Sequence, residues 1–96
     1  EEKKPGYMGI IPDFPEDGVK GVRIARVKVS GAAANAGLQE GDLMVQINKT
    51  PIADMGDFYR AMLNRQPDEV VEVEVLRDGE RQRVNVTLQS RLQEGV

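Results

Sequence analysis

The sequence predicts a small, β-rich α+β domain: a partly open barrel of five or six short strands, capped by one short and one longer helix. Three observations support this fold class. The chain has 96 residues, which fits one domain and leaves little room for two cores. Several short runs alternate between apolar and polar residues, as strands do, and one longer run has the period of a helix.

The first clear strand covers residues 22–29, where valine and isoleucine lie among arginine and lysine. The alternation is imperfect near Ala25 and Arg26, which predicts a strand with an irregularity at that point. One face of this strand is expected to be buried.

The stretch "SGAAANAGLQEGD", residues 30–42, predicts a helix of one or two turns. Ser30 is expected to cap its N-terminus, and Gly37 supplies the left-handed conformation that ends it. Leu38, which follows Gly37, is expected to pack back against the helix, as an apolar residue commonly does after a left-handed helix end.

A second strand follows, and its alternation has a period of two. Leu43, Val45 and Ile47 are expected on the buried face, and Met44, Gln46 and Asn48 alternate with them. A turn at residues 48–51 ends this strand.

From Asp54 the period changes to that of a helix, which is expected to run to about Arg65 and to stop before Pro67. Asp54 is expected to be the N-cap, and Asp57 places an acidic group in the first turn, where the helix dipole favours it. Four residues continue at helical spacing: Phe58, Ala61, Met62 and Arg65.

The residues after Pro67 predict a β-hairpin. Valines at 71, 73 and 75 alternate with Glu72 and Glu74, and the returning strand carries Val84, Val86 and Leu88. Between them, Asp78 and Gly79 suit a type I′ turn, which needs positive φ at both central residues.

Composition excludes several classes of function. The chain is 40% hydrophobic and 30% charged with a net charge of −3, and its lysines and arginines are scattered among acidic residues. The chain has no basic stripe that would bind a nucleic acid, and no apolar run reaches the roughly 18 residues of a membrane span.

The chain has no His and no Cys, and its only serines are Ser30 and Ser90. Nucleophile pairs with histidine and thiolate or imidazole metal sites are therefore excluded, and no metal or cofactor is expected.

Carboxylates remain as the candidates for other chemistry. Asp13, Glu16 and Asp17 lie close together, but their spacing fits neither a calcium loop nor an acid/base pair, so a solvated loop rim is the favoured interpretation.

Several segments resemble a bacterial PDZ domain in its circularly permuted form. They are "GYMGI", "SGAAANAGLQEGDLMVQINKTPI", "DFYRAM" followed by Pro67, and "VEVEVLRDGE" with its returning strand. The run from Ala36 to Asp42, Ala-Gly-Leu-x-x-Gly-Asp, is the most specific of these. The resemblance covers nearly the whole chain and is strongest to PDZ domains of secreted bacterial zinc aminopeptidases, with HtrA-type serine proteases and other proteases carrying similar modules.

The resemblance implies a peptide-binding site. Backbone N–H groups of the loop Tyr7-Met8-Gly9-Ile10 would converge on the terminal carboxylate of a peptide, with Gly9 supplying an unusual φ and close approach. The peptide would lie antiparallel to the strand that continues through Ile11 and Pro12. The opposite wall would be the helix, through Met55, Tyr59 and Met62, while Phe58 and Ala61 turn inward.

Each of these assignments has a structural alternative. Tyr7, Met8 and Ile10 would also suit an ordinary edge strand packed on the sheet, and Met55, Tyr59 and Met62 would suit ordinary core. Lys3 and Lys4 are expected in a solvated terminus rather than beside the carboxylate.

Pro12 departs from what strand addition needs, because it has no N–H to donate to the peptide. Binding is therefore expected to be weak, on the order of tens of micromolar or poorer. Alternatively, residues 12–15 bend the strand away and leave the groove closed or filled by the protein itself.

These observations predict a noncatalytic module, with residues 1–5 a disordered terminus, 6–90 the domain and 91–96 a tail or linker. The chain starts without Met and is expected to be a piece of a longer periplasmic or extracellular bacterial protease or peptidase. The expected partners are a peptide or protein C-terminus with an apolar last residue, and the parent's own catalytic domain. The alternative function is an interdomain spacer or regulatory domain that binds no free peptide, and an autonomous enzyme is the least favoured class.

Overall fold

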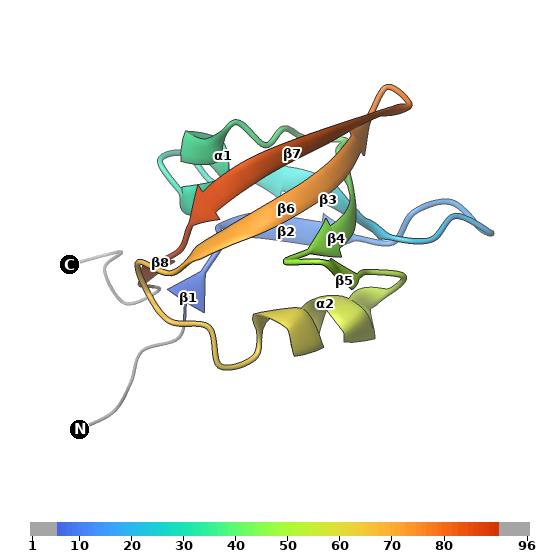
Figure 1. Ribbon diagram of the computed structural model, residues 1–96. Helices are drawn as coiled ribbons and strands as arrows, with labels where there is room; N and C mark the ends of the chain where they lie inside the picture. Colours follow the sequence, from blue (N-terminus) through green and yellow to red (C-terminus); the bar gives the residue numbers. More distant parts are fainter. Residues whose placement is uncertain (1–5, 91–96) are drawn as a thin grey trace.

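The computed structural model describes residues 6–90, which form two sheets and two helices (Figure 1). The predicted terminus at 1–5 and tail at 91–96 lie outside the described residues. The elements in chain order are β1 (Gly6–Tyr7), β2 (Ile10–Asp13), β3 (Val22–Val27), α1 (Ala32–Ala36), β4 (Leu43–Ile47), β5 (Thr50–Pro51), α2 (Met55–Met62), β6 (Val70–Arg77), β7 (Glu80–Thr87) and β8 (Gln89–Ser90).

The larger sheet is antiparallel throughout, in the order β2-β3-β4-β6-β7, with β5 added to β4. β1 and β8 form a separate two-stranded sheet that joins the two ends of the described chain. The curled sheet stays open, and α1 and α2 lie on opposite sides of it (Figure 1). The predicted β-rich α+β fold is confirmed, and the barrel is not closed.

The core lies inside the curl of the larger sheet, where Ile24, Ile47 and Val73 have no exposed surface. The expected irregularity in β3 is present: Ile11 pairs with Arg26 and Pro12 with Ile24, so Ala25 has no partner on β2. β3 ends at Val27, and the prediction that Val29 belongs to the strand is wrong. Val29 is 88% exposed, because the chain turns at Ser30, whose φ is +62°.

β4 departs from the predicted alternation. Met44, expected on the open face, has no exposed surface, and Val45, expected on the buried face, is only half-buried. The pairing of β4 with β6 shifts between Met44 and Gln46. This bulge adds one residue to β4 and changes which side chains face the core.

The N-terminus of α1 was predicted wrongly, and its C-terminus correctly. Gly31 is the N-cap, and no side chain caps the helix, because Ser30 is in the left-handed region. At the other end Gly37 has φ +97°, and the Leu38 N–H donates to the Ala33 carbonyl over 3.0 Å. Leu38 is buried there, as expected.

α2 begins as predicted, with reciprocal capping by two aspartates. The Asp57 N–H donates to Asp54 Oδ1 over 2.9 Å, and the Ala53 N–H donates to Asp57 Oδ2 over 2.9 Å. The helix ends at Met62 and not near Arg65, since Leu63 is extended and Asn64 has φ +66°.

The β6–β7 hairpin is confirmed, with positive φ at Asp78 (+53°) and Gly79 (+82°). Glu74 is nearly buried on this hairpin, with side-chain exposure of 4%, and its carboxylate accepts hydrogen bonds from Arg81 and Arg83 of β7. The pKa of Glu74 lies below its ordinary value of 4.5, first because of the Arg83 hydrogen bond and also because of the Arg81 charge, against the opposing effect of burial.

A buried ion pair joins the end of α1 to the hairpin. Arg77 donates from Nε to Asp42 Oδ1 over 2.8 Å and from Nη2 to Asp42 Oδ2 over 2.7 Å. Arg77 Nη2 also donates to the Gly37 carbonyl, and Asp42 Oδ2 accepts from the Gln39 N–H. Asp42 is 1% exposed, so this aspartate depends on these donors for its hydrogen bonds.

We predict that Arg77→Ala lowers the free energy of unfolding by about 3 kcal/mol, because it leaves the Asp42 carboxylate buried without its cation. Urea unfolding followed by circular dichroism measures this loss. Arg26→Ala, at an exposed position of β3, is the matched control and is expected to change stability by less than about 0.5 kcal/mol. Equal losses for the two variants would contradict the assigned role of the pair.

We predict that Glu74 stabilises the fold above its ordinary pKa and that this contribution is lost as pH falls through its lower folded-state pKa. The difference in unfolding free energy between the native protein and Glu74→Gln should thus shrink on acidification below about pH 4.5. Denaturant melts across pH measure it, with Glu72→Gln on the same strand as the control for loss of a carboxylate. A difference that does not change with pH would refute the prediction.

Candidate functional site

A groove of about 410 Å³ lies between β2 and α2. Backbone and side chains from the first residues of the described chain form one wall, and α2 forms the other. The lining residues are Gly6, Tyr7, Met8, Gly9, Ile10, Ile11, Pro12, Phe58, Tyr59 and Met62.

The groove is lined by apolar side chains of graded exposure. Met8 and Phe58 are 2% and 7% exposed, so they belong to the core as well as to the groove. Ile11 and Tyr59 are 58% and 61% exposed on opposite walls. An extended apolar segment placed between them would cover surface that now faces water.

The loop before β2 has its carbonyl groups held from inside the protein. The Met8 carbonyl accepts from the Ala33 N–H of α1 over 2.8 Å, and the Gly9 carbonyl accepts from the Lys28 N–H over 2.8 Å. In a trans peptide the N–H points opposite to the preceding carbonyl, and the chain contains no cis bond among the described residues. The N–H groups of Gly9 and Ile10 therefore point away from α1 and β3, at the mouth of the groove.

Gly9 makes this arrangement possible. Its φ is +79°, and a Cβ atom there would lie 3.3 Å from the Gly31 Cα. Successive N–H groups around such a residue form a concave, positively polarised nest that suits an anion. The loop is fixed at its start by pairing of Gly6 with Ser90 and by the Gly6 N–H, which donates to the Arg65 carbonyl beyond α2.

Most of the residues predicted for the site line this one groove: Tyr7, Met8, Gly9, Ile10, Ile11, Pro12, Tyr59 and Met62. Met55 does not. It lines a neighbouring hollow of about 360 Å³ between α2 and the β2–β3 loop. Phe58 was predicted only to turn inward, and it also lines the groove. Its spacing of four from Met62 was the signal that the sequence offered.

Pro12 lies in β2, at one edge of the larger sheet. Proline is accepted at an edge strand where its nitrogen faces away from the neighbouring strand. β2 stays paired with β3 as far as Asp13, so residues 12–13 do not bend away and the groove is open.

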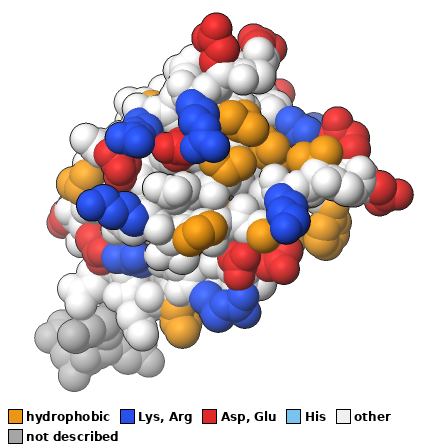
Figure 2. Space-filling view, turned by 45° about the vertical axis from the view of Figure 1, so that its right-hand side comes forward, with side chains coloured by type: hydrophobic (Ala, Val, Ile, Leu, Met, Phe, Trp, Pro, Cys, Tyr) orange, Lys and Arg blue, Asp and Glu red, His pale blue; other side chains and the backbone are white. Residues whose placement is uncertain are grey.

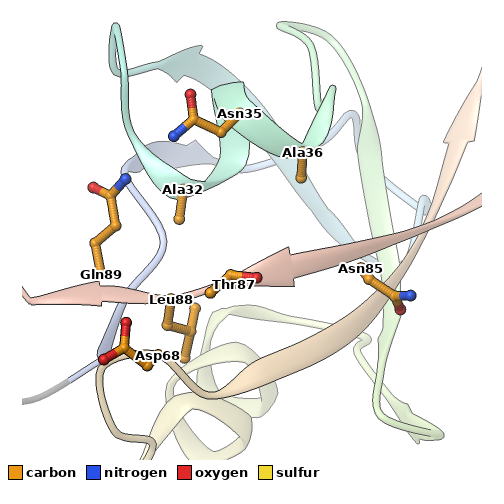
Figure 3. Close-up of a pocket in the computed structure, with 8 residues that line it drawn as sticks. All are labelled: Ala32, Asn35, Ala36, Asp68, Asn85, Thr87, Leu88 and Gln89. Carbon is orange, nitrogen blue, oxygen red and sulfur yellow. The ribbon is translucent and has the colours of Figure 1, made fainter.

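A second hollow, of about 230 Å³, lies between α1 and the strands β7 and β8 (Figure 3). Its rim is mostly polar, with Asn35, Asn85, Thr87 and Gln89, and Asn35 and Gln89 donate to the Ser30 carbonyl. Asp68 is the one ionisable side chain among its lining residues. This hollow thus differs in chemistry from the apolar groove and lies outside it.

On the face that Figure 2 shows, acidic and basic side chains are mixed, and neither kind forms a large patch. Neither helix of residues 6–90 is long and apolar enough to cross a bilayer. Among those residues, no cluster of three or more acidic side chains is arranged to hold a metal ion.

The fold, with a groove between an edge strand and a helix, is that of a known family of domains: the family model of the PDZ domain matches residues 6–88. The chain belongs to the PDZ family. A probable periplasmic serine endoprotease, DegP-like, from Pseudomonas savastanoi pv. phaseolicola is 32% identical over 94% of this chain and 21% of its own length. The chain thus spans about a fifth of that relative and corresponds to a noncatalytic accessory domain rather than to the protease part.

Solved structures show the same fold. The HtrA-type protease AlgW with a decapeptide has a TM-score of 0.80 at 24% identity, over 92% of this chain and 30% of that one. An aminopeptidase N family protein from Idiomarina loihiensis has a TM-score of 0.79 at 21% identity, over 94% of this chain and 15% of that one. An HtrA-type protease and an aminopeptidase, the two kinds of protein that the sequence resembles, therefore both contain a domain of this fold.

We predict that Gly9→Ala lowers the free energy of unfolding by about 1 to 3 kcal/mol, because alanine is strained at positive φ and its Cβ would press on Gly31. Gly18→Ala is the matched control, since Gly18 has φ +84° with open space around it. Thermal or urea unfolding compares the two. The loss should be larger for Gly9→Ala, and an equal loss would mean that the contact with Gly31 costs nothing.

Proposed function

We propose that this domain captures the C-terminus of a peptide or protein by β-strand addition in the groove between β2 and α2. The last residue of the ligand is apolar and lies between Met8, Ile10 and Met62. Its carboxylate accepts hydrogen bonds from the N–H groups of the loop, including those of Gly9 and Ile10. The ligand backbone then runs antiparallel to β2.

The orientation of the Gly9 and Ile10 N–H groups carries this proposal. Their peptide planes are fixed by hydrogen bonds from Ala33 and Lys28 on the far side of the loop. Two N–H groups held outward beside an apolar groove suit an anionic group attached to an apolar side chain, which is what a peptide C-terminus supplies. The family match and the decapeptide in the AlgW structure support the same class of ligand.

The binding experiment is an NMR titration of the isotopically labelled domain with peptides ending in Val, Leu, Ala or Phe. Each peptide is compared with its C-terminally amidated twin, which removes the charge and leaves the side chains. We expect saturable shifts at Met8, Gly9 and Ile10 and along α2, with a dissociation constant on the order of tens of micromolar or weaker, and loss of these shifts on amidation. An absence of shifts at millimolar peptide would refute carboxylate capture.

We predict that Pro12→Ala tightens peptide binding by roughly 2- to 12-fold, because it restores an N–H on the free edge of β2 and one hydrogen bond nets about 0.5 to 1.5 kcal/mol. Pro51→Ala, on exposed β5, is the control for the general effect of removing a proline. Isothermal titration calorimetry with one peptide measures all three proteins. Unchanged or weaker binding by Pro12→Ala would show that the ligand does not pair with β2 at this position.

We further propose that the domain serves as an accessory domain of a bacterial periplasmic or extracellular protease, as the DegP-like relative suggests. The spacer alternative, in which the domain only packs on its own catalytic domain, needs no open carboxylate site. The groove of about 410 Å³ favours the peptide-binding function.

A further inference from the structure

A hollow of about 360 Å³ adjoins the far end of the groove, where the β2–β3 loop meets the start of α2. Its apolar surface comes from Phe14, Pro15, Val19 and Met55. Phe14 is 77% exposed and Val19 is 39% exposed. A phenylalanine so exposed next to an apolar groove is surface that a ligand would cover.

The hollow lies on the path of an extended ligand. Phe14 directly follows β2, which is the strand that lines the groove, and Met55 stands one turn before Tyr59 on the other wall. Strands advance about 3.3 Å per residue, so a peptide whose last residue lies beside Ile10 would reach the level of Phe14 about four to six residues before its end.

The β2–β3 loop that shapes the hollow is held in place by hydrogen bonds. The Phe14 N–H donates to Asp13 Oδ1, the Val19 N–H donates to the Glu16 carbonyl, and the Gly21 N–H donates to the Ala53 carbonyl beside α2. The hollow therefore exists before a ligand arrives, which lowers the entropy cost of binding there.

The charged side chains that line the hollow are all acidic: Glu16, Asp17 and Asp54. Arg23, which does not line it, forms an ion pair with Glu16 over 2.5 Å. Asp54 accepts the Asp57 N–H as the N-cap of α2. Asp17 is exposed on the loop and forms no ion pair within residues 6–90 that would offset its charge. A lysine or arginine of a ligand would complement this rim.

We propose that the hollow is an upstream subsite of the groove, which receives an apolar and a basic side chain located four to six residues before the C-terminus of the ligand. The inference rests on the proposed capture of a C-terminus. It adds a length and a composition to the ligand: at least about six extended residues, with a basic residue near the upstream end. The subsite also supplies contacts that offset the hydrogen bond missing at Pro12.

The test compares a four-residue peptide ending in Val with an eight-residue peptide that shares this end and carries Phe and Lys five and six residues before the C-terminus. We expect the longer peptide to bind roughly five- to tenfold more tightly by calorimetry. Replacing its Lys by Glu should remove most of the gain, and raising the salt concentration should reduce it.

Variants of the domain assign the gain to the hollow. Phe14→Ala should remove it while leaving the four-residue peptide unaffected, and Val29→Ala, at another exposed apolar position, is the matched control. Asp17→Asn should reduce the preference for Lys over Glu, with Glu80→Gln on exposed β7 as its control.

The two proposals fail in different ways. If the short peptide binds through its carboxylate and the long one gains nothing, the subsite is refuted and C-terminal capture stands. If neither peptide binds, or if amidation makes no difference, C-terminal capture is refuted and the subsite proposal falls with it. A gain that survives Phe14→Ala would also refute the subsite.

Discussion

The fold depends on one buried ion pair, between Asp42 and Arg77. Asp42 precedes β4 and Arg77 ends β6, and the pair reaches α1 through the Gly37 carbonyl. The Asp42 backbone carbonyl in turn accepts the Ile24 N–H of β3 over 2.8 Å. This pair of side chains thus links the start of β4, the end of β6 and the short helix. α1 has only five residues and no side-chain cap, so tertiary contacts rather than its own propensity must hold it.

The position of α1 matters because it reaches the groove from behind. Its Ala33 N–H holds the Met8 carbonyl, and that hydrogen bond sets the direction of the Gly9 N–H. The Asp42–Arg77 pair holds the other end of the same helix, through the Gly37 carbonyl. Burying a charge pair carries a desolvation cost, and here the carboxylate is compensated by two bonds from Arg77 and one from the Gln39 N–H.

Patterns within a segment predicted the local structure well, and contacts between distant segments explain the errors. The hairpin turn at Asp78 and the left-handed end at Gly37 follow from residue type, and so does the Asp54 cap. The β4 bulge that buries Met44 depends on how β6 pairs with it, which no local alternation encodes. For the site, the family resemblance predicted the residues of the loop and of both walls, and all of them except Met55 line the groove. Met55 lies outside the groove because its contacts depend on the β2–β3 loop, and Glu74 became buried because two arginines on β7 cover it.

The pairing of β1 with β8 has a mechanical consequence. Gly6 lies opposite Ser90, so any polypeptide that continues from either end leaves the domain at the same place. A domain whose ends lie together can be inserted into a longer protein with little change to the structure on either side. The shared attachment point adjoins Tyr7 at one end of the groove. A pull on the flanking chain would act first on the β1–β8 pair, and then on the loop after β1 and on β7, which directly precedes β8.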